Sequence, residues 1–323
     1  MKARIAATLA AIACLGFGTL ASAQSYPAKP VKIIVPAQPG GGLDLIGRTV
    51  ADQLSRSLDQ SFVVENLSGG GGVIACQAVA RAAPDGYTLM VGYVATHATN
   101  PAVHRVPYDP VKDFTAIAMV GGTPNMLVSG PALSITDLRA LVDYAKKSPG
   151  KLTFGSGGIG TLNHLIMEQL KGAAGFEVVT AHYRGIGPAF TDLLGGQVQV
   201  MTPGLAAALP HLRSKKVKPI AVTGHERHRL VPEVPTFEES GYKGFDALQW
   251  YGIVGPAKLP AEVTRKLNAE INRAIASPAL QQRLSAEAID PMPMTPGQFG
   301  QYIEAELARW SRLARERNIL LDD

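Results

Sequence analysis

The 323-residue sequence predicts an α/β protein with two lobes. Short, continuously apolar runs alternate with segments of helical periodicity, which is the pattern of parallel strands that helices cover on both faces. The chain is also longer than a typical single domain, which favours two. Two glycine-rich turns stand where a predicted strand passes into a predicted helix. These turns suggest one anion held between the two lobes.

The first 23 residues are expected to be a cleaved signal peptide. Lys2 and Arg4 precede the apolar stretch Ile5–Leu20, and Ala21-Ser22-Ala23 forms an A-x-A cleavage site. The stretch is too short and wrongly flanked for a membrane-spanning helix. Cys14 loosely resembles a lipoprotein cleavage site, but the apolar run continues beyond it, which argues against cleavage there. We therefore expect a secreted, soluble protein.

Apolar runs bounded by turn residues predict the strands, and apolar stripes at helical spacing predict the helices between and after them. The predicted strands are Val31–Val35, Phe62–Glu65, Tyr87–Tyr93, Leu152–Phe154, Phe176–Thr180, Val198–Met201 and Pro219–Thr223. A helix is predicted over Asp44–Leu58. Near the C-terminus, Val263 to Ile275 and Phe299 to Leu313 carry two further stripes, and Pro260, Pro278 and Pro296 mark helix boundaries.

Two segments are expected to cross between the lobes. Phe114–Val120 would carry the chain into the second lobe, and Leu248–Val254 would carry it back. The predicted first lobe comprises residues 24–122 with 250–323, and the second comprises residues 123–249. Two crossing segments imply a hinge and a cleft that closes on its ligand.

Composition and charge exclude several classes of function. The net charge of +5 comes from dispersed residues, and aromatic residues make up 6% of the chain, so we expect no binding of nucleic acid. Cys76 is the lone cysteine after the signal peptide and is interpreted as a small buried residue. The motif His225-Glu226-Arg227-His228 spaces its histidines at i and i+3, where a zinc helix needs i and i+4. We interpret it as a surface turn and expect no metal and no cofactor.

The first turn, Pro39–Asp44, follows Val31–Val35, and the second turn, Gly155–Thr161, follows Leu152–Phe154. The start of a helix carries unpaired N–H groups and partial positive charge, and glycine lets an anion approach them closely. The second turn also matches the dinucleotide fingerprint G-x-G-x-x-G. The acid expected about 20 residues further on would have to be Glu177, at the start of the next strand, so we favour anion binding.

Ser156 is the candidate nucleophile, but its surroundings do not match an esterase motif. The pattern G-x-S-x-G requires glycine where this chain has Phe154. His164 lies two helical turns away and is poorly placed to act as a base. We expect no catalytic residue and favour Ser156 as a hydroxyl donor to a carboxylate. A secreted serine hydrolase using Ser156 is the alternative.

Four polar residues follow the predicted strand Tyr87–Tyr93, at the edge where α/β sheets bind ligands. They are Tyr93, Thr96, His97 and Asn100. Either they cap the local backbone, or they line the far end of the ligand pocket. Arg184 is the best charged candidate for pairing with a carboxylate, and an outward-facing side chain is the competing interpretation.

An ordered series of short motifs along the chain resembles the Bug-type periplasmic substrate-binding proteins of tripartite tricarboxylate transporters. Each motif is weak by itself, but together they span almost the whole chain after the signal peptide. The motifs are Tyr26–Pro30, Pro39–Gly41, Val64–Asn66, Pro84–Leu89, Val106–Pro110, Tyr183–Gly185, Asp192–Gly196, Val234–Thr236, Trp250–Gly252 and Gly255–Ala257.

The resemblance implies a two-lobed Venus-flytrap periplasmic-binding-protein fold (type II-like) and a monomeric, non-enzymatic receptor. It would deliver a small mono- or dicarboxylate to membrane transporter subunits, although a sensor that feeds a signalling receptor stays open. The resemblance nominates ligand-binding residues on both turns, namely Gln38, Gly40, Gly41, Gly42, Asp44, Ser156, Gly157, Gly158, Gly160, Thr161 and His164. Many relatives carry acidic residues where this chain reads Val198–Gly204, which argues against an amino-acid ligand.

Overall fold

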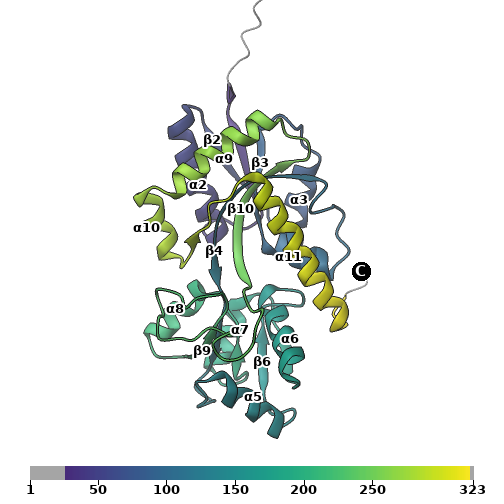
Figure 1. The fold of residues 1–323 in the computed structure, drawn as a ribbon, viewed down its shortest axis with the longest axis vertical. Coiled ribbons are helices and arrows are strands. Elements are labelled where there is room, and N and C mark those ends of the chain that lie inside the picture. The colour runs from purple at the N-terminus through teal and green to yellow at the C-terminus, as the bar shows by residue number, and fades with distance from the viewer. Residues whose placement is uncertain (1–25, 321–323) are drawn as a thin grey trace, which may run out of the picture.

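The computed structural model describes residues 26–320, which form an α/β fold around two β-sheets (Figure 1). The predicted signal peptide and Cys14 lie outside these residues. The strands are β1 (Val31–Val35), β2 (Phe62–Asn66), β3 (Thr88–Tyr93), β4 (Phe114–Pro124), β5 (Met126–Ser129), β6 (Thr153–Ser156), β7 (Val179–His182), β8 (Val200–Met201), β9 (Lys218–Val222), β10 (Leu248–Pro256) and β11 (Asp290–Pro291).

The helices connect these strands and, at the C-terminus, follow them. The α-helices are α2 (Gly42–Leu58), α3 (Val73–Ala80), α4 (Asn100–Val103), α5 (Leu138–Lys147), α6 (Leu162–Ala174), α7 (Ile186–Leu194), α8 (Leu205–Arg213), α9 (Ala261–Ile275), α10 (Pro278–Ala286) and α11 (Pro296–Glu316). A 3₁₀ turn, η1 (Gly70–Gly72), precedes α3, and a π-helical turn, η2 (Ala95–Thr99), precedes α4.

Both sheets are mixed, although each keeps a parallel half. Within the described residues the first sheet has the strand order β11-β4-β10-β3-β1-β2, and the second has the order β7-β6-β8-β5-β9. In the first sheet β1 pairs in parallel with β2 and β3, and β10 runs antiparallel to β3. In the second sheet β6 pairs in parallel with β7 and β8, and β5 runs antiparallel to β8.

The strands β4 and β10 link the two sheets. They pair antiparallel from Phe114 opposite Pro256 to Pro124 opposite Leu248, with two bulges between. After Asn125 the chain enters β5 of the second sheet, and β10 brings it back. The two crossing segments predicted from the sequence are confirmed as parts of these strands, and the structure has the two-lobed fold that the sequence predicts.

This connection points the carboxyl ends of the parallel strands of each sheet toward the other sheet. Because β10 starts at the crossing and β3 runs antiparallel to it, β1, β2 and β3 all end at the crossing. Because β5 starts at the crossing and runs antiparallel to β8, the strands β6, β7 and β8 end there as well. The turns after β1 and β6 therefore lie on facing edges, where α/β sheets bind ligands.

The C-terminal helix α11 makes a third connection, because it begins beside the first sheet and ends next to α6 (Figure 1). Its start carries a capping box between Thr295 and Gln298. On the second sheet's side, Arg309 donates hydrogen bonds to Asp246 Oδ1 at 2.6 Å and to the Gly244 carbonyl at 2.7 Å. Trp310, the next residue of α11, is fully buried.

The sequence predicted helices more closely than strands. The predicted helix Asp44–Leu58 corresponds to α2. The stripe from Val263 to Ile275 is buried in α9, at Val263, Leu267, Ile271 and Ile275. The parallel pairing that the apolar runs predict holds for β1 with β2 and β3 and for β6 with β7 and β8, whereas β4, β5, β10 and β11 run antiparallel to their neighbours. The predicted strand Phe176–Thr180 is also displaced, because the paired residues are Val179–His182.

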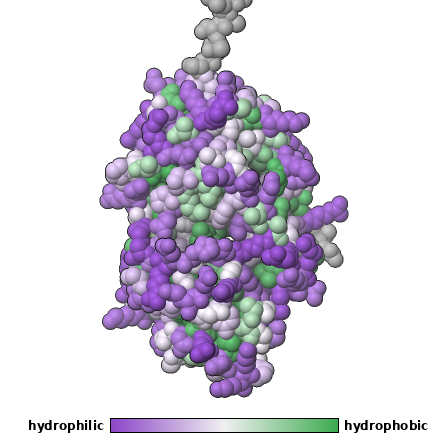
Figure 2. Space-filling view, in the orientation of Figure 1, coloured by the Kyte–Doolittle hydropathy of each residue, from purple (hydrophilic) through white to green (hydrophobic). Residues whose placement is uncertain are grey.

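Hydrophilic residues cover most of the face shown in Figure 2, and the hydrophobic residues on it form small, separate patches. Among residues 26–320, no helix combines the length and apolar character needed to cross a membrane.

We predict that Gly252→Ala destabilises the fold, because β10 packs directly against α11 at this glycine. A Cβ atom there would lie 2.2 Å from Phe299 Cζ and 2.9 Å from the Ala118 carbonyl oxygen. Overpacking of this kind costs about 1–3 kcal/mol of unfolding free energy, which urea titration would measure. Gly297→Ala is the matched control, because a Cβ there meets nothing within 4 Å. Equal stability of both variants would contradict the packing account.

Candidate functional site

The first turn is organised by the carboxylate of Asp44, which is 4% exposed. Its Oδ2 accepts the Gly40 N–H and the Arg48 Nε–H, each at 2.9 Å, and its Oδ1 accepts Asn66 Nδ2–H at 2.9 Å. The hydrogen bond from Arg48 is the main cause that lowers the pKa of Asp44 to about 2. Asp44 is therefore ionised, and its contacts hold the turn in shape.

These contacts leave the start of α2 open. No side chain among the described residues caps this helix at Gly41, so the N–H groups of its first turn lack acceptors. Gly40, Gly41 and Gly42 are exposed, and a Cβ atom on any of them would meet nothing within 4 Å. Gln38 is also exposed and donates to Ser68 Oγ at 2.6 Å. An anion can therefore approach the positive end of α2.

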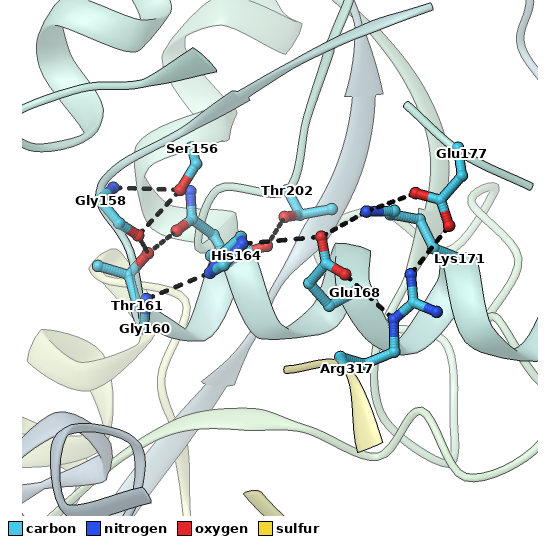
Figure 3. A network of polar contacts seen from close by, with 11 residues as sticks. Ser156, Gly158, Gly160, Thr161, His164, Glu168, Lys171, Glu177, Thr202 and Arg317 are labelled. Atoms are coloured by element: carbon cyan, nitrogen blue, oxygen red, sulfur yellow. Dashed lines mark hydrogen bonds and ion pairs between the residues drawn. The ribbon is translucent and has the colours of Figure 1, made fainter. Parts of the chain in front are cut away.

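The second turn is tied together by its own side chains (Figure 3). Ser156 is fully buried, and its Oγ accepts the Gly158 N–H at 3.1 Å and donates to the Gly158 carbonyl at 2.9 Å. Thr161 Oγ1 also donates to that carbonyl, at 2.7 Å. The Gly160 N–H donates to His164 Nδ1 at 3.2 Å. These side chains shape the turn, and no side chain within the described residues caps α6 at Thr161.

His164 is held neutral in this arrangement. Burial is the main cause that lowers its pKa to about 4, and the neighbouring His182, whose ring centroid lies 4.8 Å away, lowers it further. Since Nδ1 accepts the Gly160 N–H, the ring proton sits on Nε2, which lies 3.7 Å from Glu168 Oε1. The imidazole thus joins the second turn to an acidic side chain one helical turn further along α6.

Glu168 is part of a four-residue ion network that reaches α11 (Figure 3). Lys171 Nζ lies 2.7 Å from Glu168 Oε1 and 2.9 Å from Glu177 Oε2. Arg317, directly after the last residue of α11, lies 3.2 Å from Glu168 Oε2 and 3.1 Å from Glu177 Oε1. Two cations therefore compensate two carboxylates, which is how a buried charge such as Glu168 is accommodated.

The polar residues after β3 divide between the core and the edge. His97 is fully buried, with its ring edge-on to Phe114, and Thr96 Oγ1 bonds the backbone of Tyr93. The contacts of Thr96 are therefore those of the local-capping interpretation, and the structure places His97 in the core. Burial lowers the pKa of His97 to about 3.

Tyr93 and Asn100 face a neighbouring tetraglycine loop, Gly69–Gly72. The Gly71 carbonyl accepts Asn100 Nδ2–H at 2.9 Å and the Tyr93 hydroxyl at 3.4 Å. All four glycines have positive φ angles, from 56° to 130°. This conformation is accessible to glycine and strained for other residues, which explains the run of four.

Arg184 is exposed and adjoins the second turn. The N–H of the next residue, Gly185, donates to the Gly157 carbonyl at 3.0 Å, which ties this loop to the turn. The sequence did not single out Asn163 and Thr202, which are buried beside the same turn and joined by a 2.6 Å hydrogen bond. A polar residue at the second position of a helix after a glycine turn was the available signal for Asn163.

The structure gives no support to the alternative chemistries. The hydroxyl of Ser156 is buried, and both of its hydrogen bonds are with Gly158. Within the described residues, no group of three or more His, Cys, Asp or Glu side chains could hold a metal ion. His228, from the histidine pair, is buried with its Nε2 3.2 Å from Asp290 Oδ2, whereas we expected the motif to lie on the surface.

Two sheets joined by crossing strands, with open helix starts on their facing edges, define a protein of the periplasmic-binding-protein class. The family model for the tripartite tricarboxylate transporter family receptor matches residues 46–319. The chain therefore belongs to this family of receptors, as the resemblance of its motifs predicted.

Relatives match over nearly the whole chain. Protein BugT from Bordetella pertussis is 35% identical over 307 residues, which are 94% of each chain. The structure of Rpa4515 from R. palustris with adipate is 33% identical, with a TM-score of 0.80 over 91% of this chain and 98% of that one. MatC from Rhodopseudomonas palustris, with bound malate, is 31% identical, with a TM-score of 0.76 over 89% and 99%.

We predict that His164 makes the folded state less stable as the pH falls. The pKa of His164 drops from 6.5 to about 4 on folding, so the unfolded chain binds more protons than the folded chain in this interval. The free energy of unfolding therefore falls by about 3 kcal/mol between pH 7 and pH 4. Urea unfolding at both pH values would measure the loss.

His97 and His182 also have lowered pKa values, so the contribution of His164 needs a variant. In His164→Asn the side-chain oxygen can still accept the Gly160 N–H but does not titrate. In this variant the free energy of unfolding should differ less between pH 7 and pH 4 than it does in the unaltered protein. An unchanged difference would show that His164 is not the titrating group.

Proposed function

We propose that the protein is a periplasmic solute receptor that captures a small mono- or dicarboxylate between the first and second turns. It then presents the ligand to a tripartite-tricarboxylate-type membrane transporter. One observation carries this proposal: two helices begin without side-chain caps on facing edges of the two sheets, each directly after a glycine-rich turn. Two positive helix ends that face each other suit one shared anion.

Hydrogen bonds from the two turns are strong enough to bind a carboxylate without a dedicated ion pair. Micromolar affinity needs about 8 kcal/mol. Each hydrogen bond to a charged group contributes about 1.5–3 kcal/mol, and each helix start about 0.3–1 kcal/mol. About four to six backbone N–H donors from the two turns would supply this free energy, with a margin for ordering costs.

The solved relatives support the choice of ligand class, because Rpa4515 was determined with adipate and MatC with malate. Both ligands are dicarboxylates. We extend that class to this chain. The segment after Gly195-Gly196, Val198–Gly204, contains no acidic side chain to meet an ammonium group, which argues against an amino-acid ligand.

The mechanism we propose is capture followed by closure. The ligand binds the first turn on the lobe of residues 24–122 and 250–323, and hinge motion brings the second turn, on residues 123–249, onto the same carboxylate. The two predicted lobes, the cleaved signal peptide of residues 1–23 and the monomeric state are parts of this proposal. The alternative, a hydrolase, is not favoured, because the Ser156 hydroxyl is buried in the turn.

A thermal-shift screen of residues 24–323 tests the ligand class. Mono-, di-, tri- and aromatic carboxylates are compared with amino acids, sugars and NAD as controls. A ligand at about 100 times its dissociation constant adds about 2.7 kcal/mol, which raises the melting temperature by several degrees. A shift confined to carboxylates supports the receptor. If no carboxylate raises the melting temperature, or if NAD does, the receptor proposal is contradicted.

Gly41→Val tests whether the first turn binds the carboxylate. Gly41 has a φ of −89°, and a Cβ there contacts nothing within 4 Å, so the fold should tolerate a side chain that blocks the anion's approach to α2. We expect carboxylate binding to be lost by calorimetry with an unchanged melting temperature. Gly158→Val is less clean, because its φ of +140° strains any side chain. Gly297→Val, outside the turns, is the matched control and should bind normally.

Arg184 would pair with the second carboxylate of a dicarboxylate. It is exposed beside the second turn, and a guanidinium binds a carboxylate through two parallel hydrogen bonds. Arg184→Ala should weaken binding of a dicarboxylate about 10-fold and leave a monocarboxylate of the same length nearly unaffected. If Arg184→Ala weakens the binding of both ligands equally, Arg184 does not contact the second carboxylate.

A further inference from the structure

A group of polar side chains connects the two sheets beside β11. Asp290 lies in β11 of the first sheet, and its partners His228 and Arg229 lie in the loop that follows β9 of the second sheet. Arg229 Nε lies 3.1 Å from Asp290 Oδ1, and the same guanidinium donates to Ser285 Oγ of α10 at 2.9 Å. These four residues, His228, Arg229, Ser285 and Asp290, are called the clasp below.

His228 makes the second contact with Asp290. Its side chain is 3% exposed, and its Nδ1 accepts the Leu230 N–H at 3.2 Å, so the Nε2 atom carries a proton. Nε2 lies 3.2 Å from Asp290 Oδ2. This contact is the main cause that lowers the pKa of Asp290, which is therefore ionised at neutral pH. Each carboxylate oxygen of Asp290 thus lies next to a donor from the loop after β9.

An apolar contact accompanies the clasp. Ala288, two residues before β11, is fully buried in an apolar cluster that includes Met126 of β5 and Val222 of β9. A groove of about 510 Å³ runs past the clasp, and its lining includes Gly122 of β4 and Leu248 of β10. The clasp therefore lies beside the crossing strands, where the proposed mechanism places the hinge.

The strand order places the clasp and the two ligand-binding turns on opposite sides of the crossing strands. In the first sheet β11 is next to β4, whereas β1, which leads into the first turn, lies beyond β10 and β3. In the second sheet β5 continues β4, with β9 on one side and β8 and β6 on the other. A rotation about the crossing strands that brings the two turns together therefore moves the two halves of the clasp apart.

We propose that the clasp holds the cleft open and thereby sets the affinity of the receptor for its ligand. This inference rests on the proposed receptor function and adds a control of the same site by residues on the far side of the hinge. Closure has to separate Asp290 from His228 and Arg229, and part of the free energy of ligand binding is used for that separation. Weakening the clasp should therefore tighten binding.

Arg229→Ala tests the clasp, because it removes both contacts of a side chain that is 46% exposed. Exposed ion pairs are weak, so we expect calorimetric affinity for malate or adipate, whichever the unaltered protein binds, to rise about 2- to 5-fold. Arg227→Ala is the matched control. Arg227 is 43% exposed in the same loop, and its partners Glu239 and the Pro232 carbonyl belong to that loop, so this variant should bind with unchanged affinity.

Asp290→Ala distinguishes the clasp from a long-range effect of charge. It removes the contacts of both His228 and Arg229, so we expect affinity to rise about 3- to 20-fold. The two clasp variants change the net charge in opposite directions. A purely electrostatic effect on an anion would therefore weaken binding in Arg229→Ala and tighten it in Asp290→Ala, whereas the clasp predicts tighter binding in both.

The melting temperature of each ligand-free variant establishes that it is folded. Unchanged or weaker binding in either folded clasp variant overturns the clasp and leaves the receptor function standing. Failure of the unaltered protein to bind any carboxylate overturns both.

Discussion

The pairing of β4 with β10 is the constraint on which the rest of the structure depends. These two strands pair along their full lengths, from Phe114 opposite Pro256 to Pro124 opposite Leu248, and they connect the two sheets. Because each strand enters or leaves the second sheet at the same point, the carboxyl ends of the parallel strands in both sheets face each other. The glycine-rich turns then follow those strand ends, so α2 and α6 both begin at the facing edges of the two sheets.

Each turn is shaped by a buried titratable side chain that has little freedom to meet the ligand itself. Asp44 holds the first turn through the Gly40 N–H, and His164 holds the second through the Gly160 N–H. The network from His164 through Glu168 to Arg317 then connects the second turn with α11 (Figure 3). Side chains thus set the geometry, while backbone N–H groups are left to bind an anion, an arrangement that needs no net charge on the ligand-facing residues.

The sequence predicted the two-lobed α/β fold, the helices α2, α9 and α11, and the two turns, because apolar periodicity and glycine report burial and backbone conformation directly. The sequence could not predict which residues pair between neighbouring strands. Phe176 and Val178 are buried, yet the strand begins at Val179, since apolarity reports burial and not hydrogen bonding. Nor could it place His97 in the core or find Asn163, because both depend on neighbours distant in the chain, Phe114 and Thr202.

The central claim is that one carboxylate binds both turns at once. A crystal structure of the protein with malate or adipate, the ligands of MatC and Rpa4515, tests it most directly. The account predicts a single ligand carboxylate within hydrogen-bond distance of N–H groups at the start of α2 and at the start of α6. A ligand held by only one of the two turns, with the other facing solvent, would contradict it.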